Sequence, residues 1–321
     1  MIENFRLTRP ELTLDPRNDG RHVLDPAKPH DRESVPFIVN IPEEGISFFT
    51  YTWVNCEGRA GAVVCLFGPG IGEEQITLGL PERPISDEMD FSDWRIDAFT
   101  MQHDLQFRSA EFAFTSDEVD LSFTFEGSHP PYAYSAHKDG CPPFCADDRI
   151  EQAGRVTGTL RLGDRTIAFN AAAHRDHSWG TRDWTAMVGY RWFVGQVGAD
   201  MSVHFWHLNA LGQMHLRGYI VKEGLMAEIS GIDISWTLDE QFRQKTLDAT
   251  IADEAGRTTS LRAEFFSHGV LIPSPDLTLN EAGARMWLDG AEGAGWLEFA
   301  WQTDYLRHIR SIPEYAPRPG G

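Results

Sequence analysis

One short stretch of the chain concentrates side chains that could exchange protons. Residues 174–184 read H-R-D-H-S-W-G-T-R-D-W. Each charged group or imidazole in it needs a partner if it is buried, so the mixture suits neither an ordinary strand nor an ordinary helix. The stretch predicts an acid–base or ligand-binding site beneath aromatic rings, or a self-satisfied charged network at a domain junction.

Histidine is the natural proton carrier here, because its free pKa lies near 6.5. If residues 202–208 form a strand, His204 and Trp206 share one face, and His207 points to the other, where we expect it to be solvated. The candidate catalytic residues are His177, His204, Asp176 and Asp183. The candidate substrate-binding residues are Trp179, Trp206, Trp192, Tyr190, Tyr132 and Tyr134.

The remaining charged residues of the stretch are expected to form a structural network with His174. Arg175 or Arg182 should make a bidentate ion pair with Asp176 or Asp183, since a guanidinium beside a carboxylate favours that geometry. A zinc-type set of His174, Asp176 and His177, with His204 opposite, is the alternative. We predict no metal, because the two arginines would repel a cation and no H-E-x-x-H helix is present.

The sequence also lacks the motifs of common cofactor and hydrolase sites. No G-x-G-x-x-G follows a predicted strand, and no Walker-type loop or G-x-S-x-G elbow occurs. We therefore predict acid–base chemistry without a cofactor.

Short β-rich runs broken by Gly, Asp or Pro dominate the chain, and helical periodicity is weak. This spacing is typical of barrels or sandwiches, so the fold class is all-β. Leu211–Gly212 and the D-E-A-G at 253–256 are predicted hairpin turns. The predicted strands are 46–54, 62–67, 107–115, 120–126, 154–162, 166–169, 187–197, 202–208, 215–221, 232–238, 246–253, 258–267 and 296–301.

We place a domain boundary after Trp184, where the charged stretch gives way to a new run of strands. The predicted domains are 1–184 and 185–321. The proline-rich segment 127–148 has no strand pattern but carries Tyr132 and Tyr134. These aromatic residues favour a packed lid that covers the mouth of a cavity. An Ω-loop that covers core is the alternative.

Charge and hydropathy exclude several classes of partner. The formal charge of −20 and a pI near 4.9 argue against nucleic acid and fit an uncharged or apolar ligand. No run approaches 18 apolar residues, and the first residues carry no apolar signal region. We expect a cytoplasmic protein with four reduced cysteines, and a homodimer is left open.

H-R-D-H-S-W-G followed by R-D-W resembles the AttH-like and carotenoid 1,2-hydratase (hydroxyneurosporene synthase) group, relatives of tocopherol cyclase. The segments 149–158 and 293–298 extend the resemblance. It implies two lipocalin-like antiparallel β-barrels in tandem, with a ligand cavity near their junction. In the hydratase branch, a His-x-Trp pair and a later Tyr-x-Asp pair are implicated in the reaction. His177-Ser178-Trp179 matches the first pair. His204-Phe205-Trp206 occupies that later position, so the family's acid is missing and alkene hydration is in doubt.

Together these observations predict a cofactor-independent lyase, hydratase or isomerase. Its substrate would be a bulky apolar or aromatic small molecule. A lyase releasing a fragment from an aromatic dimer and a terpenoid hydratase or cyclase are two concrete forms. The alternative is a non-catalytic lipocalin-like carrier of a hydrophobic ligand, in which the charged stretch is only a structural clamp.

Overall fold

The computed structural model describes residues 5–28 and 30–317, and they are almost entirely β-structure. Strands hold 62% of the residues and helices 9%, which confirms the all-β prediction. The chain divides into two compact units. Unit 1 contains residues 1–41, 48–65 and 77–182, and unit 2 contains residues 42–47, 66–76 and 183–321. Two short segments from the predicted N-terminal domain, 42–47 and 66–76, therefore group with the second unit.

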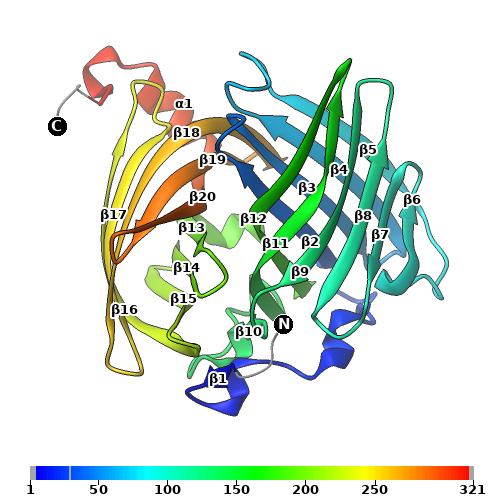
Figure 1. Cartoon of the computed structure of the whole chain (residues 1–321), viewed down its shortest axis with the longest axis horizontal. Helices are drawn as coiled ribbons and strands as arrows, with labels where there is room; N and C mark the ends of the chain where they lie inside the picture. Colours follow the sequence, from blue (N-terminus) through cyan, green and yellow to red (C-terminus); the bar gives the residue numbers. More distant parts are fainter. Residues whose placement is uncertain (1–4, 29, 318–321) are drawn as a thin grey trace. The chain divides into compact units, whose positions relative to one another are not determined.

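Unit 1 is built on a strongly curved antiparallel sheet that forms a nearly closed barrel. Its strand order is β5-β4-β3-β2-β12-β11-β9-β8-β7-β6, with β10 paired to β11. Figure 1 labels these strands. The strands are β2 (Asp31–Ile41), β3 (Ile46–Asn55), β4 (Arg59–Phe67), β5 (Ile76–Pro84), β6 (Trp94–Ile96), β7 (Phe99–His103), β8 (Ser109–Thr115), β9 (Val119–Gly127), β10 (Tyr132–Ala133), β11 (Asp148–Leu162) and β12 (Arg165–Thr181). β1 (Arg6–Leu7) and the 3₁₀ turns η1 (Pro10–Leu12), η2 (Pro16–Asp19), η3 (Phe91–Asp93) and η4 (Tyr134–Ala136) accompany them.

Unit 2 is a closed eight-stranded barrel. Its order is β16-β15-β14-β13-β20-β19-β18-β17, and β17 pairs back with β16. The strands are β13 (Met187–Val197), β14 (Met201–Ala210), β15 (Gln213–Lys222), β16 (Leu225–Leu238), β17 (Gln244–Asp253), β18 (Thr258–Ser274), β19 (Leu277–Leu288) and β20 (Ala291–Gln302). η5 (Trp184–Ala186) precedes the barrel, and α1 (Thr303–Arg310) and η6 (Pro313–Tyr315) follow it. None of the helices in the described part of the chain has the length and apolarity to cross a membrane.

Alternating side chains explain the core of unit 2. Phe193, Phe205 and Phe299 belong to an apolar cluster to which all eight strands contribute, so this face of each strand is the barrel interior. The β14–β15 hairpin closes at Leu211 and Gly212, whose φ values of 50° and 75° are those of a two-residue type I′ turn. This turn was predicted from the sequence.

The structure corrects the interpretation of the charged stretch. Residues 174–181 form the second half of the 17-residue strand β12, whereas the sequence analysis ended the strand at Phe169. Its polar side chains are compatible with a strand because β11 and β2, which pair with β12 on either side, present polar partners. β2 itself was missed, because its opening D-R-E-S-V-P has the composition of a loop.

Close strand packing makes Gly154 on β11 intolerant of a side chain. A Cβ there would lie 2.5 Å from the Glu126 carbonyl oxygen and 2.4 Å from the Phe125 ring. We expect Gly154→Ala to lower the free energy of unfolding by about 1–3 kcal/mol, the usual range for overpacking. Gly231→Ala is the control, because nothing lies within 4 Å of a Cβ at Gly231. Equal denaturation midpoints for the two variants would contradict this prediction.

Candidate active site

The two faces of β12 carry two separate networks of buried polar groups. Successive side chains of a strand point to opposite faces, so Arg175, His177 and Trp179 share one face and His174 and Asp176 the other. Arg175 lies opposite Gln152 on β11 and Phe37 on β2, so the first face is the inner face of the barrel.

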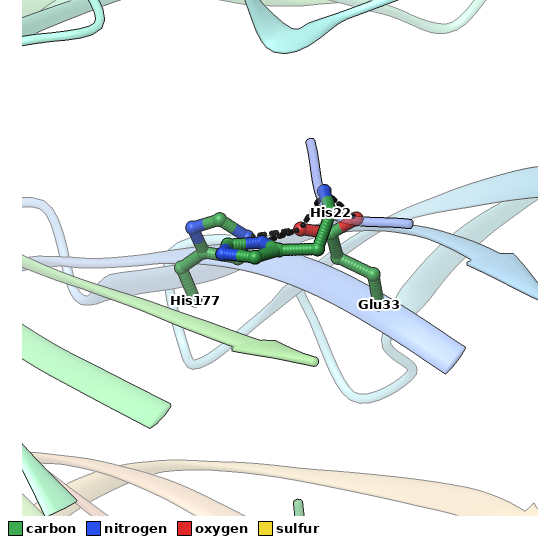
Figure 2. A group of neighbouring side chains, drawn as sticks. All are labelled: His22, Glu33 and His177. Carbon is green, nitrogen blue, oxygen red and sulfur yellow. Dashed lines mark hydrogen bonds and ion pairs between the residues drawn. The ribbon is translucent and has the colours of Figure 1, made fainter. Parts of the chain in front are cut away.

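On the inner face, Glu33 accepts hydrogen bonds from two imidazoles. His177 Nε2 lies 2.6 Å and His22 Nδ1 2.8 Å from Glu33 Oε1, and Figure 2 shows both rings converging on the carboxylate. The backbone N–H of His22 donates to Glu33 Oε2 at 2.9 Å. The side chains of Glu33 and His177 are fully buried, and that of His22 is 20% exposed. His22 stacks on Trp179 with ring centroids 3.8 Å apart, so the network reaches solvent at these two partly buried residues.

A second carboxylate–histidine pair lies on the same inner face. Asp19 Oδ1 lies 3.0 Å from Arg175 Nη1 and 3.1 Å from His103 Nδ1, and Asp19 Oδ2 accepts from the Phe107 N–H at 2.7 Å. The guanidinium of Arg175 also donates to Gln152 Oε1 at 2.8 Å. All these side chains are buried, so this network ties η2 to β7, β11 and β12.

Both histidines present a buried ring nitrogen that is not used by the fold. His177 Nδ1 and His103 Nε2 have no hydrogen-bond partner among the described residues. Phe91 contacts both rings, with centroids 5.2 Å from His177 and 5.6 Å from His103. A buried imidazole oriented by a carboxylate, with its other nitrogen open, is the arrangement of a general base.

The electrostatics set the protonation states of the pair. Burial alone would raise the pKa of Glu33, but hydrogen bonds from His177 and His22 outweigh it and hold the pKa below its usual value. Burial lowers the pKa of His177, against the opposing effect of its hydrogen bond to Glu33. Glu33 is therefore ionised and His177 neutral at pH 7. The hydrogen bond to Glu33 places the imidazole proton on Nε2 and leaves the lone pair on Nδ1.

A carboxyl group with the opposite tendency lies near the exposed end of the network. Asp148 is the cross-strand partner of Trp179 on β11, and its Oδ1 accepts from the backbone N–H groups of Ser135 and Arg149. Burial raises the pKa of Asp148, and these hydrogen bonds only partly offset the effect. Two carboxyl groups whose environments push their pKa values apart are the usual sign of separate acid and base roles.

The outer face of β12 carries a buried polar network in which Arg149 and Glu151 join Asp176 and His174. Arg149 bridges Glu151 at 2.6 Å and Asp176 at 2.7 Å, and His174 Nε2 lies 2.7 Å from Glu151. Tyr134 donates to Glu151 at 3.2 Å.

Arg175 pairs with Asp19 and not with Asp176, which was one of the predicted pairs. Neighbours on a strand point to opposite faces, so Arg175 cannot reach Asp176. Arg182 donates to the Cys145 carbonyl and to Ser178, and Asp183 caps η5 by accepting from Thr185.

The predicted lid is part of the packed structure. Tyr132 and Tyr134 are completely buried, and Tyr132 lies opposite Glu151 in the short β10–β11 ladder.

The four cysteines are free, as expected.

The other predicted site residues gather on unit 2. Tyr190 and Trp206 pack edge to face at 5.3 Å, and His204 lies 5.6 Å from Trp192. His204 Nδ1 bonds to the Phe193 carbonyl oxygen at 3.1 Å.

His204 and Trp206 share a face, as predicted, but it is the face opposite to the barrel core. His207 was expected to be outward and solvated. It points inward with Phe205, because the apolar residues of β14 that reach the core are Val203 and Phe205.

Sequence reasoning missed five residues of the site: Asp19, His22, Glu33, His103 and Asp148. Four of them come from segments that read as loops or weak strands and lie far from β12 in the sequence, 144 residues in the case of Glu33 and His177. Asp148 begins β11, the strand before β12, at the end of the proline-rich segment. The one available signal was the acidic Glu33 at the head of the apolar run V-P-F-I-V.

Two histidines and a carboxylate also make a donor set of the zinc type. One ligand atom each from His22, Glu33 and His177 lies within 4.8 Å of the others. Their N-to-O separations of 2.6 and 2.8 Å are hydrogen-bond distances, whereas ligands about 2.0 Å from a shared tetrahedral zinc lie roughly 3.3 Å apart. The donors fit zinc by type, and they would have to move apart to hold it. The alternative set of His174, Asp176 and His177 is wrong, because His177 points to the other face of β12.

Two hollows on the outer surfaces of the sheets are separate from these networks. One of about 510 Å³ lies over β7, β8 and β9 of unit 1, and one of about 750 Å³ lies over β16, β17 and β18 of unit 2. Neither is lined by the histidines or by their carboxylate partners.

Comparison with solved structures finds the same fold in proteins of very different sequence. An AttH-like protein of Nitrosomonas europaea is 11% identical with a TM-score of 0.65, over 91% of this chain and 98% of its own. CghA is 11% identical with a TM-score of 0.61, over 93% and 98%. Kievitone hydratase from Nectria haematococca is 9% identical with a TM-score of 0.59, over 93% and 96%.

These similarities confirm the resemblance drawn from the charged stretch at the level of the fold. A search of curated proteins gave no match. A family model described as "Domain of unknown function (DUF7064)" matches residues 15–303, and the chain belongs to that family.

Proposed function

We propose that this protein is a cofactor-independent acid–base enzyme of the hydratase or lyase type, acting on a bulky, uncharged apolar or aromatic molecule. The observation that carries the proposal is the buried Glu33–His177 pair on the inner face of β12, in which His177 Nδ1 has no hydrogen-bond partner among the described residues. A carrier needs an apolar interior but has no use for an oriented imidazole within it. Kievitone hydratase adds support, because its name indicates that hydration occurs on this fold.

In the proposed hydration, His177 Nδ1 takes a proton from water as the water oxygen bonds to one alkene carbon. Asp148 gives its carboxyl proton to the other carbon, and the proton on His177 then returns to Asp148 through solvent. The ionised Glu33 stabilises the imidazolium formed in between. In the reverse direction, the same groups remove water from an alcohol. Trp179 and His22, stacked and partly exposed, offer a flat surface for an aromatic or conjugated substrate.

The test is a conversion screen of the purified full chain. Uncharged aromatic and terpenoid alkenes and alcohols are incubated in ordinary and ¹⁸O-labelled water, and products are followed by mass. Hydration adds one labelled oxygen, dehydration removes one oxygen, and lyase chemistry releases a fragment. If one compound binds but is recovered unchanged, and no compound in the library is converted, the protein is a carrier instead.

Metal removal tests the cofactor part of the proposal. We expect the turnover found in the screen to be unchanged after dialysis against a chelator, because the donors of His22, Glu33 and His177 are hydrogen-bonded to one another. A loss of activity on chelation that added zinc restores would contradict this prediction and make these three residues ligands.

A further inference from the structure

One end of the closed unit 2 barrel holds an arginine in aromatic surroundings. The guanidinium carbon of Arg191 lies 4.2 Å from the centroid of Trp236 and 4.6 Å from that of Phe299. The two rings are 5.6 Å apart at 72°, so they form a corner against which the guanidinium lies. The edge of the guanidinium is therefore left for another partner.

No acidic residue among those that the structure describes neutralises this charge. Within residues 5–28 and 30–317, the Arg191 side chain has no ion pair or hydrogen bond, and its Nε is buried without a partner. By contrast, the buried Arg149 pairs with Glu151 and Asp176, the buried Arg175 with Asp19, and the half-buried Arg257 with Asp253. Burial lowers the pKa of Arg191. A half-buried cation left unpaired in a chain of net charge −20 is the pattern expected of an anion-binding residue.

Two further polar atoms beside Arg191 also lack partners among the described residues. His207 is its cross-strand neighbour on β14, and His207 Nδ1 is buried without a hydrogen bond. Trp301 stacks on Phe299 at 4.9 Å, and its indole Nε1 is likewise without one. Burial and the charge of Arg191 lower the pKa of His207, so its imidazole is neutral at pH 7 and can donate one hydrogen bond.

The surroundings favour a ligand with an apolar body. Phe193 and Phe205 stack at 5.3 Å in the next layer of the interior and fill it, so a ligand would be confined to the barrel end. Leu211 and Met214, in the hairpin at the same end, are 70% and 52% exposed. Trp301 also packs against Phe242 and against Leu306 and Ile309 of α1, so this end is partly covered, and Arg191 itself stays partly exposed. Exposed apolar side chains beside a partly exposed cation are typical of sites for amphipathic molecules.

We propose that this end of the unit 2 barrel binds a small aromatic or aliphatic carboxylate. The carboxylate would pair with the edge of the Arg191 guanidinium, because a planar guanidinium and a planar carboxylate form two parallel hydrogen bonds. The apolar body would lie against Trp236, Phe299 and Trp301. The site uses none of the groups of the proposed active site, so a test of one proposal does not decide the other.

The test compares two matched probes on the full chain, 2-naphthoate and the uncharged 2-naphthalenemethanol, by calorimetry and tryptophan fluorescence. The wild type is expected to bind naphthoate on the order of 10-fold or more tightly than the alcohol, the usual effect of a charge-assisted hydrogen bond. Arg191→Gln should abolish that preference and leave binding of the alcohol unchanged. Arg262→Gln is the control, because Arg262 also lies over a ring, Trp287 at 5.9 Å, but is exposed and paired with Glu264.

Arg191→Lys covers the case in which the glutamine variant fails to fold. It keeps the charge but loses the bidentate geometry, so naphthoate should bind more weakly than to the wild type and still more tightly than the alcohol. Equal binding of the two probes to the wild type, or no saturable binding of naphthoate at millimolar concentration, would overturn the proposal. So would a preference for naphthoate that survives in Arg191→Gln.

Discussion

Replacing His177 by glutamine is expected to lower turnover by about 10²–10⁴-fold on the substrate that the screen identifies, the usual contribution of a general base. Glutamine retains a group that can donate to Glu33, but it offers no nitrogen that takes up a proton near neutral pH. Because the change removes little volume, the fold should survive, which a β-type circular dichroism spectrum and an unchanged elution volume would check.

The pH profile separates a chemical role of His177 from a structural one. The base must be neutral, so kcat/KM should rise with pH through the pKa of His177, which burial places below its usual 6.5. The acid must be protonated, so activity should fall through the pKa of Asp148, which burial raises. The two shifts move toward each other, and the optimum is expected on the acid side of neutrality. Asp148→Asn should remove the alkaline limb.

His204→Gln is the matched comparison, because His204 is as completely buried as His177. Both histidines were predicted from the sequence to transfer protons. In the structure, His204 Nδ1 bonds to the Phe193 carbonyl oxygen, and its ring lies on the face of β14 away from the barrel core. We expect its replacement to change turnover far less. Wild-type kcat in the His177→Gln enzyme, or an equal loss in both variants, would be inconsistent with the proposed base.

Replacing Asp19 by asparagine is expected to reduce the free energy of unfolding by about 3–5 kcal/mol at pH 7. The change leaves the fully buried Arg175 without its counter-ion, and breaking one half of a buried ion pair has an effect of that size. Chemical denaturation of the full chain measures it. Arg175→Met combined with Asp19→Asn should lose less than the sum of the single variants, because no uncompensated charge remains.

The stability difference between wild type and Asp19→Asn should depend on pH. Although burial opposes ionisation, Arg175 and His103 hold the pKa of Asp19 far below its usual value. A depressed pKa gives stability that is fully present above the unfolded-state value near 3.9 and is lost as pH falls toward the folded-state value. The two proteins should therefore converge in acid. Asp304→Asn, which breaks the exposed Arg307–Asp304 pair, should leave the midpoint unchanged. A wild-type midpoint for Asp19→Asn would show that this network does not stabilise the barrel.

The local pattern of the sequence was sufficient for much of the fold. The alternation over 187–197 predicted β13 with its observed bounds, and Leu211–Gly212 predicted a turn that the structure has. These features depend on the period of a strand and on backbone preferences of single residues, both of which are properties of neighbouring positions. The density of charge at 174–184 likewise indicated polar groups that are buried and paired. Most of the polar side chains in this stretch are buried.

Only the tertiary structure decided which groups meet. The alternation of β12 puts His177 with Arg175 and apart from Asp176, but it does not say which face meets the core or what lies opposite. Those outcomes depend on the pairing of β12 with β2 and β11, and on η2, which brings Asp19 to Arg175 across 156 residues. Contacts at such separations are selected by the packing of the whole barrel and leave no periodic trace in the sequence. For this reason the histidine could be predicted from its own neighbours, whereas its carboxylate Glu33 could not.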